Sequence, residues 1–307
     1  MQKVSIITVN YNNSHVTDAL LQSIFATNTY TNIEIIVVDN ASKENPVPNW
    51  QRQYPNVQFI RSEVNLGFAG GNNVGIKAAT GYYFFLVNND TEFTEGLVET
   101  LVNTMNQHPQ IGIISPKIKY FDQPETLQYA GYTPMNYFTA RNSCIGQFEI
   151  DKGQYNHLTG KTGYIHGAAM MVSKHAIDKA GLMAENFFLY YEEIDWCDRI
   201  KQQNLEAWVN MNALIFHKES ISVGKNSALK EYFMNRNRIL FIRKNANFLQ
   251  QIIFYAYFLL LVVPRNIFAY IKNGDVAFIK QLLKAIWWNC TNKTDSNYLG
   301  FTFKTKS

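Results

Sequence analysis

The first ninety residues alternate short apolar runs with segments of helical periodicity. Residues 4–9 (VSIITV) are mostly β-branched and end at polar residues, and residues 33–38 (IEIIVV) repeat this pattern after a helix-like stretch at 16–26. The same criteria predict a strand at 57–61, a helix from about 72 to 79 and a strand at 82–87. Because these strands are almost continuously apolar, we predict an α/β fold whose parallel sheet is covered by helices on both faces.

Polar side chains follow three of the predicted strands. Asn10 comes after the first strand, Asp39 after the second, and the sequence Asn88-Asn89-Asp90 after the fourth. Sheets of this kind bind ligands at the carboxyl ends of their strands. A carboxylate beside two amides offers oxygen ligands, which Mg²⁺ and Mn²⁺ prefer, and such an ion can bridge to a diphosphate. The alternative is an Asx turn that only closes the strand.

The pattern between residues 111 and 217 is less regular. A strand is predicted at 111–114, and aromatic loops follow as far as about residue 156, where we expect the sheet to become irregular. A later apolar run at 213–216 ends in His217. A lone histidine is usually structural, but one that ends a strand can complete an oxygen-rich metal site.

A glycine-rich segment, residues 65–75 (NLGFAGGNNVG), leads into the second predicted helix. Such a turn can present backbone N–H groups to a diphosphate or a sugar. Its spacing matches neither G-x-G-x-x-G nor the P-loop, which disfavours a dehydrogenase or an NTPase. A plain tight turn explains the glycines equally well.

The segment 187–199 (FFLYYEEIDWCDR) places four carboxylates among bulky apolar residues, which is costly unless they are paired or perform chemistry. For a helix that begins near Tyr191, the face of Glu193 is predicted to be apolar and that of Glu192 charged. The predicted neighbours are Trp196, Cys197 and Ile200 for Glu193, and Asp195 and Arg199 for Glu192. A carboxylate held against apolar groups at a helix N-terminus suits a general base. The alternative is a helix cap with an Asp195–Arg199 pair.

The C-terminal sixty residues are rich in apolar helical patterns. We expect the run at 252–263 to stop at Pro264, short of the ~20 residues that a membrane-spanning helix needs. Residues 276–288 form a predicted amphipathic helix with Lys280 and Lys284 outside its apolar face and two tryptophans at its end. Attachment to a membrane surface is the favoured interpretation, and a buried helical hairpin or a dimer interface is the alternative.

Composition narrows the classes that remain. A chain of 307 residues with 47% hydrophobic content can bury a substantial core. Its three widely spaced cysteines fit neither a disulfide framework nor a zinc site and indicate reduced cytosolic thiols. The N-terminal apolar run is too short for a signal peptide, so we do not expect export. The net charge of +4 is mild, and we find no support for nucleic-acid binding.

Taken together, these motifs resemble the family 2 glycosyltransferases, and in particular the rhamnosyltransferase-like branch of bacterial cell-surface polysaccharide synthesis. The resemblance runs from about residue 4 to 245 and includes Asn10-Tyr11, the VDNAS segment at 38–42, every fixed position of N-x-G-F-A-x-G-x-N-x-G at 65–75, and a variant of the metal-binding D-x-D motif at 88–90. It implies a Rossmann-like GT-A fold with a C-terminal helical extension. The implied divisions are a nucleotide-sugar half (1–110), an acceptor and catalytic half (111–245) and an amphipathic extension (246–307).

The resemblance also implies roles for individual residues. The catalytic base of related enzymes falls on Glu193, where aspartate is usual, and Glu192 is the second choice. Asp90 and His217 would hold Mg²⁺ or Mn²⁺, and His217 opens a motif with Ser220 and Ser222 that closes over the donor. The segment 167–171 (GAAMM) would line the acceptor side. The implied donor-binding residues are Asn10, Tyr11, Asp39 (on the base), Asn65, Gly67, Phe68, Asn72, Asn89 and Arg236 (on phosphate, with a charged helix face as the alternative).

The expected activity is therefore inverting, metal-dependent transfer of a sugar from a nucleoside diphosphate to a hydroxyl of a glycan or lipid-linked glycan. The resemblance favours dTDP-L-rhamnose, with a UDP-hexose or UDP-galactofuranose as the alternative donor. A non-catalytic protein that binds a nucleotide-sugar, or a membrane partner, is a further alternative. A nucleotidyltransferase is disfavoured because residues 10–13 (NYNN) carry no charge. We expect a cytoplasmic protein, peripheral on the inner face of the cell membrane, with a homodimer left open.

Overall fold

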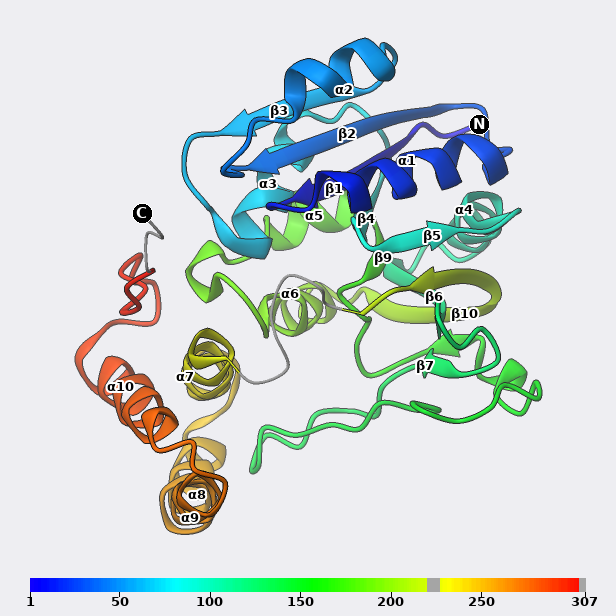
Figure 1. Cartoon of the computed structure of the whole chain (residues 1–307). Helices are drawn as coiled ribbons and strands as arrows, with labels where there is room; N and C mark the ends of the chain where they lie inside the picture. The colour runs from blue at the N-terminus through cyan, green and yellow to red at the C-terminus, as the bar shows by residue number, and fades with distance from the viewer. Residues whose placement is uncertain (220–226, 304–307) are drawn as a thin grey trace.

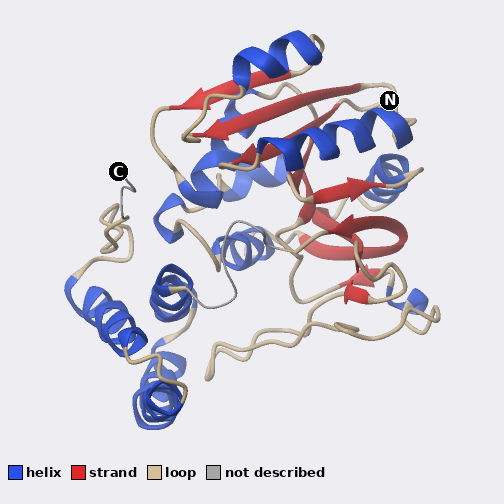
Figure 2. Ribbon diagram, in the orientation of Figure 1, coloured by secondary structure: helices blue, strands red, loops and turns tan. Residues whose placement is uncertain are grey.

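The computed structural model describes residues 1–219 and 227–303, which form one mixed α/β sheet with helices packed around it (Figures 1 and 2). The strands are β1 (Val4–Asn10), β2 (Ile33–Asn40), β3 (Gln58–Ser62), β4 (Tyr83–Asn88), β5 (Thr91–Phe93), β6 (Ile111–Tyr120), β7 (Leu127–Tyr129), β8 (Gly160–Lys161), β9 (Ala169–Ser173) and β10 (Glu206–His217). The helices are α1 (Ser14–Thr27), α2 (Val47–Gln53), α3 (Gly67–Ala78), α4 (Leu97–Gln107), α5 (Lys174–Ala180), α6 (Glu192–Lys201), α7 (Ala228–Asn245), α8 (Phe248–Tyr257), α9 (Val263–Lys272) and α10 (Ala277–Thr291). Short 3₁₀ turns lie at Asn156–Leu158 and Glu185–Phe187.

The N-terminal part of the sheet confirms the predicted parallel arrangement. Its order is β3-β2-β1-β4, and β1 pairs in parallel with both β2 and β4. Successive residues of β1 point to opposite faces, so that Ile6 joins one hydrophobic core and Ile7 the other. Helices α1, α2 and α4 cover the first face, and α3, α5 and α6 cover the second. This two-sided burial explains why the strands are apolar throughout.

The sheet continues without a break beyond residue 110, in the order β4-β9-β6-β10-β5. Strands β6 and β10 are longer than the predicted segments at 111–114 and 213–217, and β10 is irregular between Asn210 and Leu214. The short strand β5 pairs antiparallel with the end of β10, so Thr91 lies opposite His217. This pairing brings the residue before Thr91, Asp90, next to His217.

Helix α3 begins at Gly67, five residues before its predicted start, and its glycines allow it to approach β1 closely. A Cβ on Gly75 would lie 2.3 Å from the Ile7 side chain, and one on Gly71 would lie 2.8 Å from Val9. The glycine pattern therefore reflects helix-to-sheet packing, where side chains would prevent contact.

The expected stop at Pro264 is wrong. In the described residues one helix, Phe248–Lys272, is long and apolar enough to cross a membrane. Proline is tolerated because it lies in the first turn of α9, directly after a π-helical segment at Phe258–Val262 that changes the hydrogen-bond register. The predicted helix at 276–288 is confirmed as α10.

Candidate active site

Asn10 is the centre of a hydrogen-bond network at the carboxyl edge of the sheet. It is fully buried, and its amide nitrogen donates to Asp39 Oδ1 at 2.8 Å and to Ser42 Oγ at 3.0 Å. Its amide oxygen accepts from Thr17 at 3.0 Å and from Asn89 at 3.5 Å. The polar residues that follow β1, β2 and β4 thus meet, as the sequence predicted, but Asn10 itself holds the strand ends together.

The structure does not present Asp39 to a ligand, contrary to its predicted contact with a nucleotide base. Its side chain has no exposed surface, and the Arg61 guanidinium forms an ion pair with it from the solvent side. Arg61 keeps about a quarter of its side chain exposed and also donates to the Ser42 carbonyl at 2.9 Å. Arg61 is therefore the residue that borders the donor side here. Tyr11, by contrast, is exposed, as a ligand contact requires.

Asp90 and His217 form the candidate metal centre. Both are almost fully buried, and Asp90 Oδ1 lies 3.1 Å from His217 Nε2. The other ring nitrogen of His217, Nδ1, is 2.7 Å from Gln128 Oε1, which orients the ring. Within the described residues, neither Asp90 Oδ1 nor His217 Nε2 makes a hydrogen bond of good geometry, so two buried polar atoms point at a common place.

This pair fits a divalent cation that is completed by a diphosphate. Adjacent ligands of an octahedral Mg²⁺ or Mn²⁺ lie about 3 Å apart, which matches the separation of the two orphan atoms. Among residues 1–219 and 227–303 there is no cluster of three or more metal-binding side chains. The remaining ligands would be phosphate oxygens and water, as is usual for ions that carry a nucleotide. The predicted partners Ser220 and Ser222 lie outside the described residues.

The amides that open the glycine-rich segment bind protein groups, and of its glycines only Gly67 makes the tight turn of the alternative interpretation. The Leu66 amide donates to Asn40 Oδ1, and the Gly67 amide to Asn65 Oδ1, each at 2.9 Å. The Phe68 amide donates to the Phe188 carbonyl at 2.7 Å. Gly67 has φ = +71°, and a Cβ there would lie 2.2 Å from the Phe188 oxygen.

The rest of this segment continues the same packing. Asn72 is buried and donates back to the Phe68 carbonyl at 3.0 Å. Asn73 exchanges hydrogen bonds with the backbone of Met183 and donates to Glu185. Asn73 thus fastens α3 to the loop that leads into α6, the helix of the predicted catalytic residues.

Helix α6 begins at Glu192, close to the predicted start, but Glu192, which was predicted to face charge, is the more buried of the two glutamates. Glu192 is the buried one, with only 2% of its surface exposed, and Glu193 is half-buried at the edge of the site. The helical pattern did not predict this order of burial, because it contains no information on the left-handed turn at Tyr191 from which the helix begins. Glu192 Oε2 has no hydrogen-bond partner within the described residues. Burial, together with the neighbouring Glu193, holds the pKa of Glu192 well above its usual value.

Glu193 has the properties of a general base. Burial raises its pKa to about 7, and the N–H groups at the start of α6 oppose that rise only partly. Its carboxyl carbon would be 3.8 Å from a Cβ on Gly167, and the Phe68 ring borders the same place at 3.9 Å. Gly167 thus leaves space beside this carboxylate, in line with the expected acceptor-side role of the segment 167–171.

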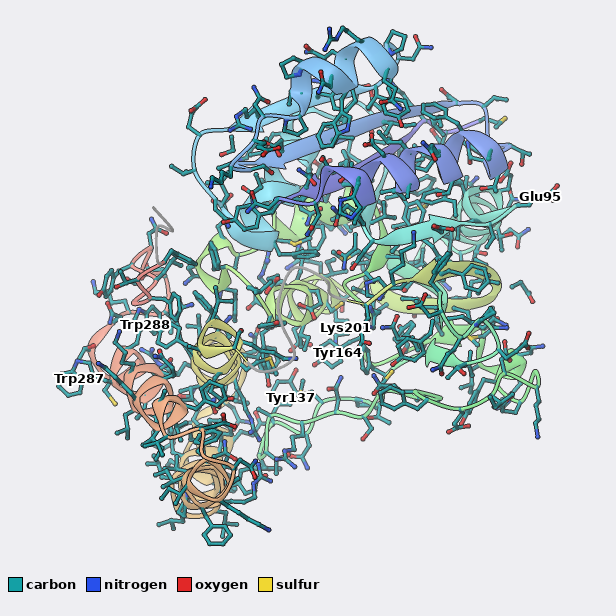
Figure 3. All side chains as sticks on the ribbon, in the orientation of Figure 1. Glu95, Tyr137, Tyr164, Lys201, Trp287 and Trp288 are labelled. Carbon is teal, nitrogen blue, oxygen red and sulfur yellow. The ribbon has the colours of Figure 1, made fainter. Side chains whose placement is uncertain are left out.

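The remaining carboxylates of α6 are structural anchors. Asp195 is fully buried and pairs with Arg199 at 2.9 Å, which is the pairing expected under the helix-cap alternative. Asp198 accepts from the hydroxyls of Tyr137 (2.5 Å) and Tyr164 (2.8 Å) and pairs with Lys201 at 2.8 Å (Figure 3). These bonds fix α6 from several directions and so fix the position of Glu193.

Arg236, the predicted phosphate contact, has its side chain enclosed by protein. It is fully buried, donates to the Asn186 carbonyl at 2.6 Å and stacks on Trp288 at 4.0 Å. Its neighbour Asn237, also fully buried, donates at 2.8 Å to each of three carbonyls of the loop before α6, those of Phe187, Leu189 and Tyr190. From the sequence, the Arg236-Asn237 pair was predicted to contact a ligand because both residues are polar. In the structure the pair instead binds backbone carbonyls of the loop before α6, and we call it the clamp.

The clamp holds a strained turn. Phe188, Tyr190 and Tyr191 have φ values of 65°, 72° and 74°, a region that bulky residues rarely adopt. Such conformations persist only where the surroundings fix them. Arg236, Asn237 and the glycine-rich segment provide that support, and the turn delivers Glu192 and Glu193 to the site.

His166 is a site residue that the sequence did not reveal. Its ring lies 6.0 Å from that of His217 and stacks on Tyr132, and burial lowers its pKa to about 3, so it is neutral. The residue is next to Gly167, which itself lies beside Glu193. A lone histidine before a small-residue run gives no sequence signal by itself, and only the fold brings it to the metal pair.

Comparison with known proteins agrees with this geometry. A family model described as glycosyl transferase family 2 matches residues 5–181, more than half of the chain. The chain therefore belongs to glycosyltransferase family 2 and is a glycosyltransferase. Members of this family transfer a sugar from a nucleotide donor.

Two curated relatives are informative. The chain is 27% identical over 245 residues to a low-salt glycan biosynthesis hexosyltransferase, Agl10, of Haloferax volcanii, covering 78% of this chain and 75% of the relative. It is 20% identical over 216 residues to an N-acetylglucosaminyl-diphospho-decaprenol L-rhamnosyltransferase of Mycobacterium tuberculosis, covering 64% of this chain and 70% of the relative.

Solved structures establish the GT-A fold. GalNAc-T7, crystallised with UDP, GalNAc and Mn²⁺, superposes with a TM-score of 0.63 at 12% identity, over 79% of this chain and 48% of that chain. The mannosyltransferase PcManGT of Pyrobaculum calidifontis, in complex with GDP-Man and Mn²⁺, gives a TM-score of 0.58 at 14% identity, over 94% and 87% of the two chains. Both neighbours contain a nucleotide and Mn²⁺, which accords with the divalent metal dependence expected of GT-A enzymes.

Proposed function

We propose that this glycosyltransferase is an inverting, metal-dependent enzyme in which Glu193 is the catalytic base. The observation that carries the proposal is the placement of a half-buried carboxylate with a raised pKa beside the small residue Gly167, on a helix fixed from several sides. Glu193 accepts the proton of the acceptor hydroxyl while that oxygen attacks the anomeric carbon, and the bond to the nucleoside diphosphate breaks. A single displacement of this kind inverts the anomeric configuration.

The other residues bind and orient. Asp90 and His217 would hold Mg²⁺ or Mn²⁺, which supplies charge stabilisation to the departing diphosphate. Tyr11 and Asn89 border the donor side, where Arg61 covers Asp39 and offers a cationic contact. His166, neutral because of burial, can accept or donate one hydrogen bond near the metal pair without adding charge.

The donor sugar is proposed to be L-rhamnose from dTDP-rhamnose, and the acceptor a lipid-linked glycan. The relative from M. tuberculosis, an L-rhamnosyltransferase that acts on a diphospho-decaprenol acceptor by its name, supports this choice. The hexosyltransferase from H. volcanii supports a hexose donor as the second candidate.

The first prediction tests the metal-bound donor site. We expect dTDP or UDP compounds with Mn²⁺ to raise the melting temperature of the wild-type protein, because a ligand that binds only the folded state stabilises it. At a ligand concentration 100 times Kd, the stabilisation is about 2.7 kcal/mol. Asp90→Ala should abolish the metal-dependent part, whereas the matched variant Asp122→Ala, at an exposed position, should keep it.

The measurement is a thermal-shift panel of nucleoside diphosphates and nucleotide-sugars with and without Mn²⁺. The compound with the largest shift identifies the donor. Equal metal-dependent shifts for Asp90→Ala and the wild type would contradict the assignment of the metal site. If no compound shifts the wild type at all, the non-catalytic alternative would gain support.

We also propose that the C-terminal helices attach the enzyme to the surface of an anionic membrane. One face of the 248–272 helix packs on the second core through Phe254, Phe258 and Val262, while Leu260 and Phe268 are 72% and 70% exposed. On α10, Trp287 is exposed at the outer side of the molecule and Trp288 is buried (Figure 3). Because the helix is fixed to the domain along one face, we propose that it lies in the membrane interface and does not cross the bilayer.

A second stripe on α10 favours anionic lipids. Val276, Ile279, Leu283 and Trp287 line an open groove together with Lys280 and Lys284. Apolar side chains with lysines beside them match the boundary between acyl chains and negatively charged headgroups. The proposed location is therefore the inner face of the cell membrane.

The second prediction concerns this surface. Phe268→Glu should weaken binding to vesicles of phosphatidylglycerol and phosphatidylcholine by roughly tenfold or more, because it removes a large apolar contact and adds repulsion. Phe148→Glu is the matched control, since Phe148 is also 70% exposed but lies outside the helical extension. Vesicle sedimentation measures the binding, and size-exclusion chromatography measures the oligomeric state. If Phe268→Glu leaves sedimentation unchanged but converts a dimer to a monomer, the surface is a dimer interface.

A further inference from the structure

A cavity of about 580 Å³ lies between α7, the C-terminal helices and the loop at residues 140–141. Tyr191, the residue immediately before α6, forms part of its wall. Tyr191 is two residues before Glu193, so their Cα atoms are at most about 7 Å apart. The cavity therefore lies next to the residue that leads into the helix of the proposed catalytic base.

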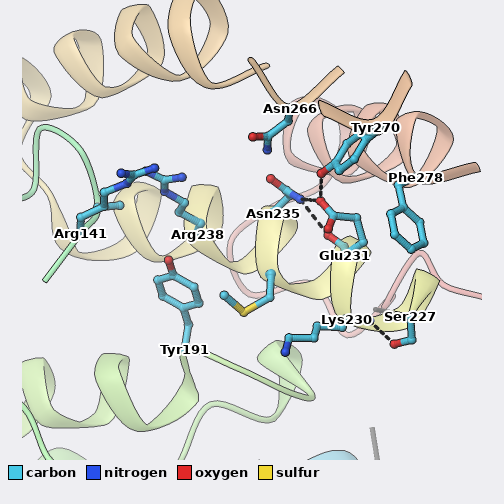
Figure 4. Close-up of a pocket in the computed structure, with 12 residues that line it drawn as sticks. Arg141, Tyr191, Ser227, Lys230, Glu231, Asn235, Arg238, Asn266, Tyr270 and Phe278 are labelled. Atoms are coloured by element: carbon cyan, nitrogen blue, oxygen red, sulfur yellow. Dashed lines mark hydrogen bonds between the residues drawn. The ribbon is translucent and has the colours of Figure 1, made fainter. Parts of the chain in front are cut away.

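The cavity contains more positive than negative charge. Arg141, Lys230 and Arg238 line it, and in the described part of the chain no carboxylate lies within ion-pair distance of these three side chains. The one acidic residue in the wall, Glu231, already accepts hydrogen bonds from Asn235 at 2.6 Å and from the Tyr270 hydroxyl. Figure 4 shows Arg141 and Arg238 next to each other above the Tyr191 ring, with Glu231 and Tyr270 at the other end.

Arg238 is a largely buried cation whose guanidinium is only partly hydrogen-bonded. Its Nη2 donates to the Thr139 carbonyl at 2.5 Å, but its buried Nε has no partner within the described residues. Aromatic rings of Tyr257 and Phe258 lie 5.9 and 5.6 Å from its guanidinium carbon. Burial, with the nearby Arg141, lowers the pKa of Arg238. An anion between the two guanidinium groups would relieve this repulsion and complete their hydrogen bonds.

At the opposite end of the cavity, apolar side chains lie beside the hydrogen-bonded pair of Glu231 and Tyr270. Phe278 of α10 and Met234 of α7 border this end, and α9 and α10 then continue into the exposed apolar surface that we assign to the membrane. A ligand that fits the whole path has a phosphate-type anion near Tyr191 and an apolar chain that leaves toward the lipid.

We propose that this cavity is the acceptor subsite for a lipid phosphate or diphosphate, with Arg141 and Arg238 as the residues that recognise the anion. The inference rests on the proposed glycosyltransferase mechanism, because the acceptor hydroxyl must reach Glu193. The anion would be held by the forked N–H groups of two arginines, a geometry suited to phosphate oxygens. Lys230 adds charge at the rim, and Tyr191 connects the subsite to the catalytic helix.

The third prediction is tested with farnesyl diphosphate as the probe, by isothermal titration of the full chain in EDTA, so that no metal-dependent donor site contributes. We expect the wild type to bind farnesyl diphosphate at least tenfold more tightly than farnesol or inorganic diphosphate. Arg238→Met and Arg141→Met should each weaken this binding about tenfold or more, since methionine keeps an apolar side chain but removes the charge. Arg52→Met, at an exposed position on α2, should bind as the wild type does.

Arg141 is exposed on a loop, so its variant is expected to fold even if Arg238→Met does not. Equal affinities of Arg141→Met and the wild type for farnesyl diphosphate would overturn the proposal. Inorganic diphosphate bound as tightly as farnesyl diphosphate would also overturn it, because the site would then not recognise a lipid chain. The thermal-shift panel with Mn²⁺ separates the two hypotheses. If the wild type binds no nucleotide, the donor site is refuted. If the wild type binds nucleotides but not farnesyl diphosphate, only this subsite is refuted.

Discussion

Glu193→Gln is expected to lower kcat by about 10²–10⁴-fold while the affinity for the nucleotide-sugar donor changes less than about twofold. The carboxylate takes up a proton only as the acceptor attacks, so its loss affects the transition state more than the ground state. Glutamine keeps the size and hydrogen-bonding shape of the side chain but cannot act as a base at neutral pH. The measurement is steady-state turnover combined with donor binding by titration calorimetry.

The pH profile gives an independent test of the same residue. With a pKa of about 7, Glu193 is protonated and inactive as a base at pH 6 and mostly ionised at pH 8. We therefore expect kcat/KM of the wild type to rise about tenfold per pH unit below pH 7 and to level off above it. The residual activity of Glu193→Gln should lack this acidic limb.

Two further variants distinguish the base from its surroundings. Glu193→Asp keeps the carboxylate with a shorter reach and should recover part of the activity, because aspartate is the usual residue at this position of the resembled motif. Glu95→Gln, at an exposed position far from α6 (Figure 3), should behave as the wild type does. A Glu193→Gln enzyme with wild-type kcat would rule out Glu193 and direct attention to Glu192.

The sequence predicted the sheet and the grouping of site residues because both depend on simple patterns. Buried parallel strands are apolar along their whole length, and parallel carboxyl ends meet at one edge, so Asn10, Asp39 and Asn89 could be placed together. The pairing of Asp90 with His217 was proposed from the family resemblance. The structure brings these two residues together through the antiparallel contact of β5 with the end of β10.

The residues whose contacts were predicted incorrectly are those that bind backbone groups distant in sequence. Arg236 and the glycine-rich segment look like ligand contacts because they are polar or flexible, yet both bind the loop before α6. Periodicity also failed to predict that Glu192 is the more buried glutamate, since it describes a helix surface but not what the rest of the fold packs against it. Pro264 was predicted to end the helix because proline usually does so. The helix continues because a π-helical segment precedes this proline, which the sequence pattern did not reveal.

These misplaced residues indicate how the enzyme orients its base. The turn at Phe188, Tyr190 and Tyr191 is strained, and strain at a functional site must be supported by other contacts. The support comes from the glycine-rich segment at one side and from α7 at the other. The donor half of the sheet is thereby coupled to the position of Glu193 through Gly67, Phe68 and Phe188.

Asn237→Ala should lower the free energy of unfolding by about 3 kcal/mol or more and kcat by about a hundredfold. It removes the Asn237 donor from three carbonyls, of which Phe187 keeps the Leu189 amide at 2.8 Å, while the part-buried carbonyls of Leu189 and Tyr190 lose their Asn237 bond, at about 1–3 kcal/mol for each. It also releases a turn that holds the base in place. A displacement of about 1 Å at a catalytic group costs on the order of 10²-fold in rate. Donor binding with Mn²⁺ should persist, because Asp90 and His217 lie on other elements. Urea unfolding and turnover below the melting transition measure the two effects.

Asn245→Ala is the matched control on the same helix. Asn245 donates at 3.0 Å to Asp195, which keeps Arg199 and Lys244 as partners, and it makes no hydrogen bond to the strained turn. We expect its effect on stability to stay near 1 kcal/mol and its kcat to stay near wild type. If Asn237→Ala does not fold, Asn237→Ser retains one donor for the three carbonyls and should give intermediate stability and turnover. An Asn237 variant that is folded, as stable as Asn245→Ala and fully active would show that the turn holds its conformation without the clamp. The position of Glu193 would then have to be set by the contacts of Asp195 and Asp198 within α6.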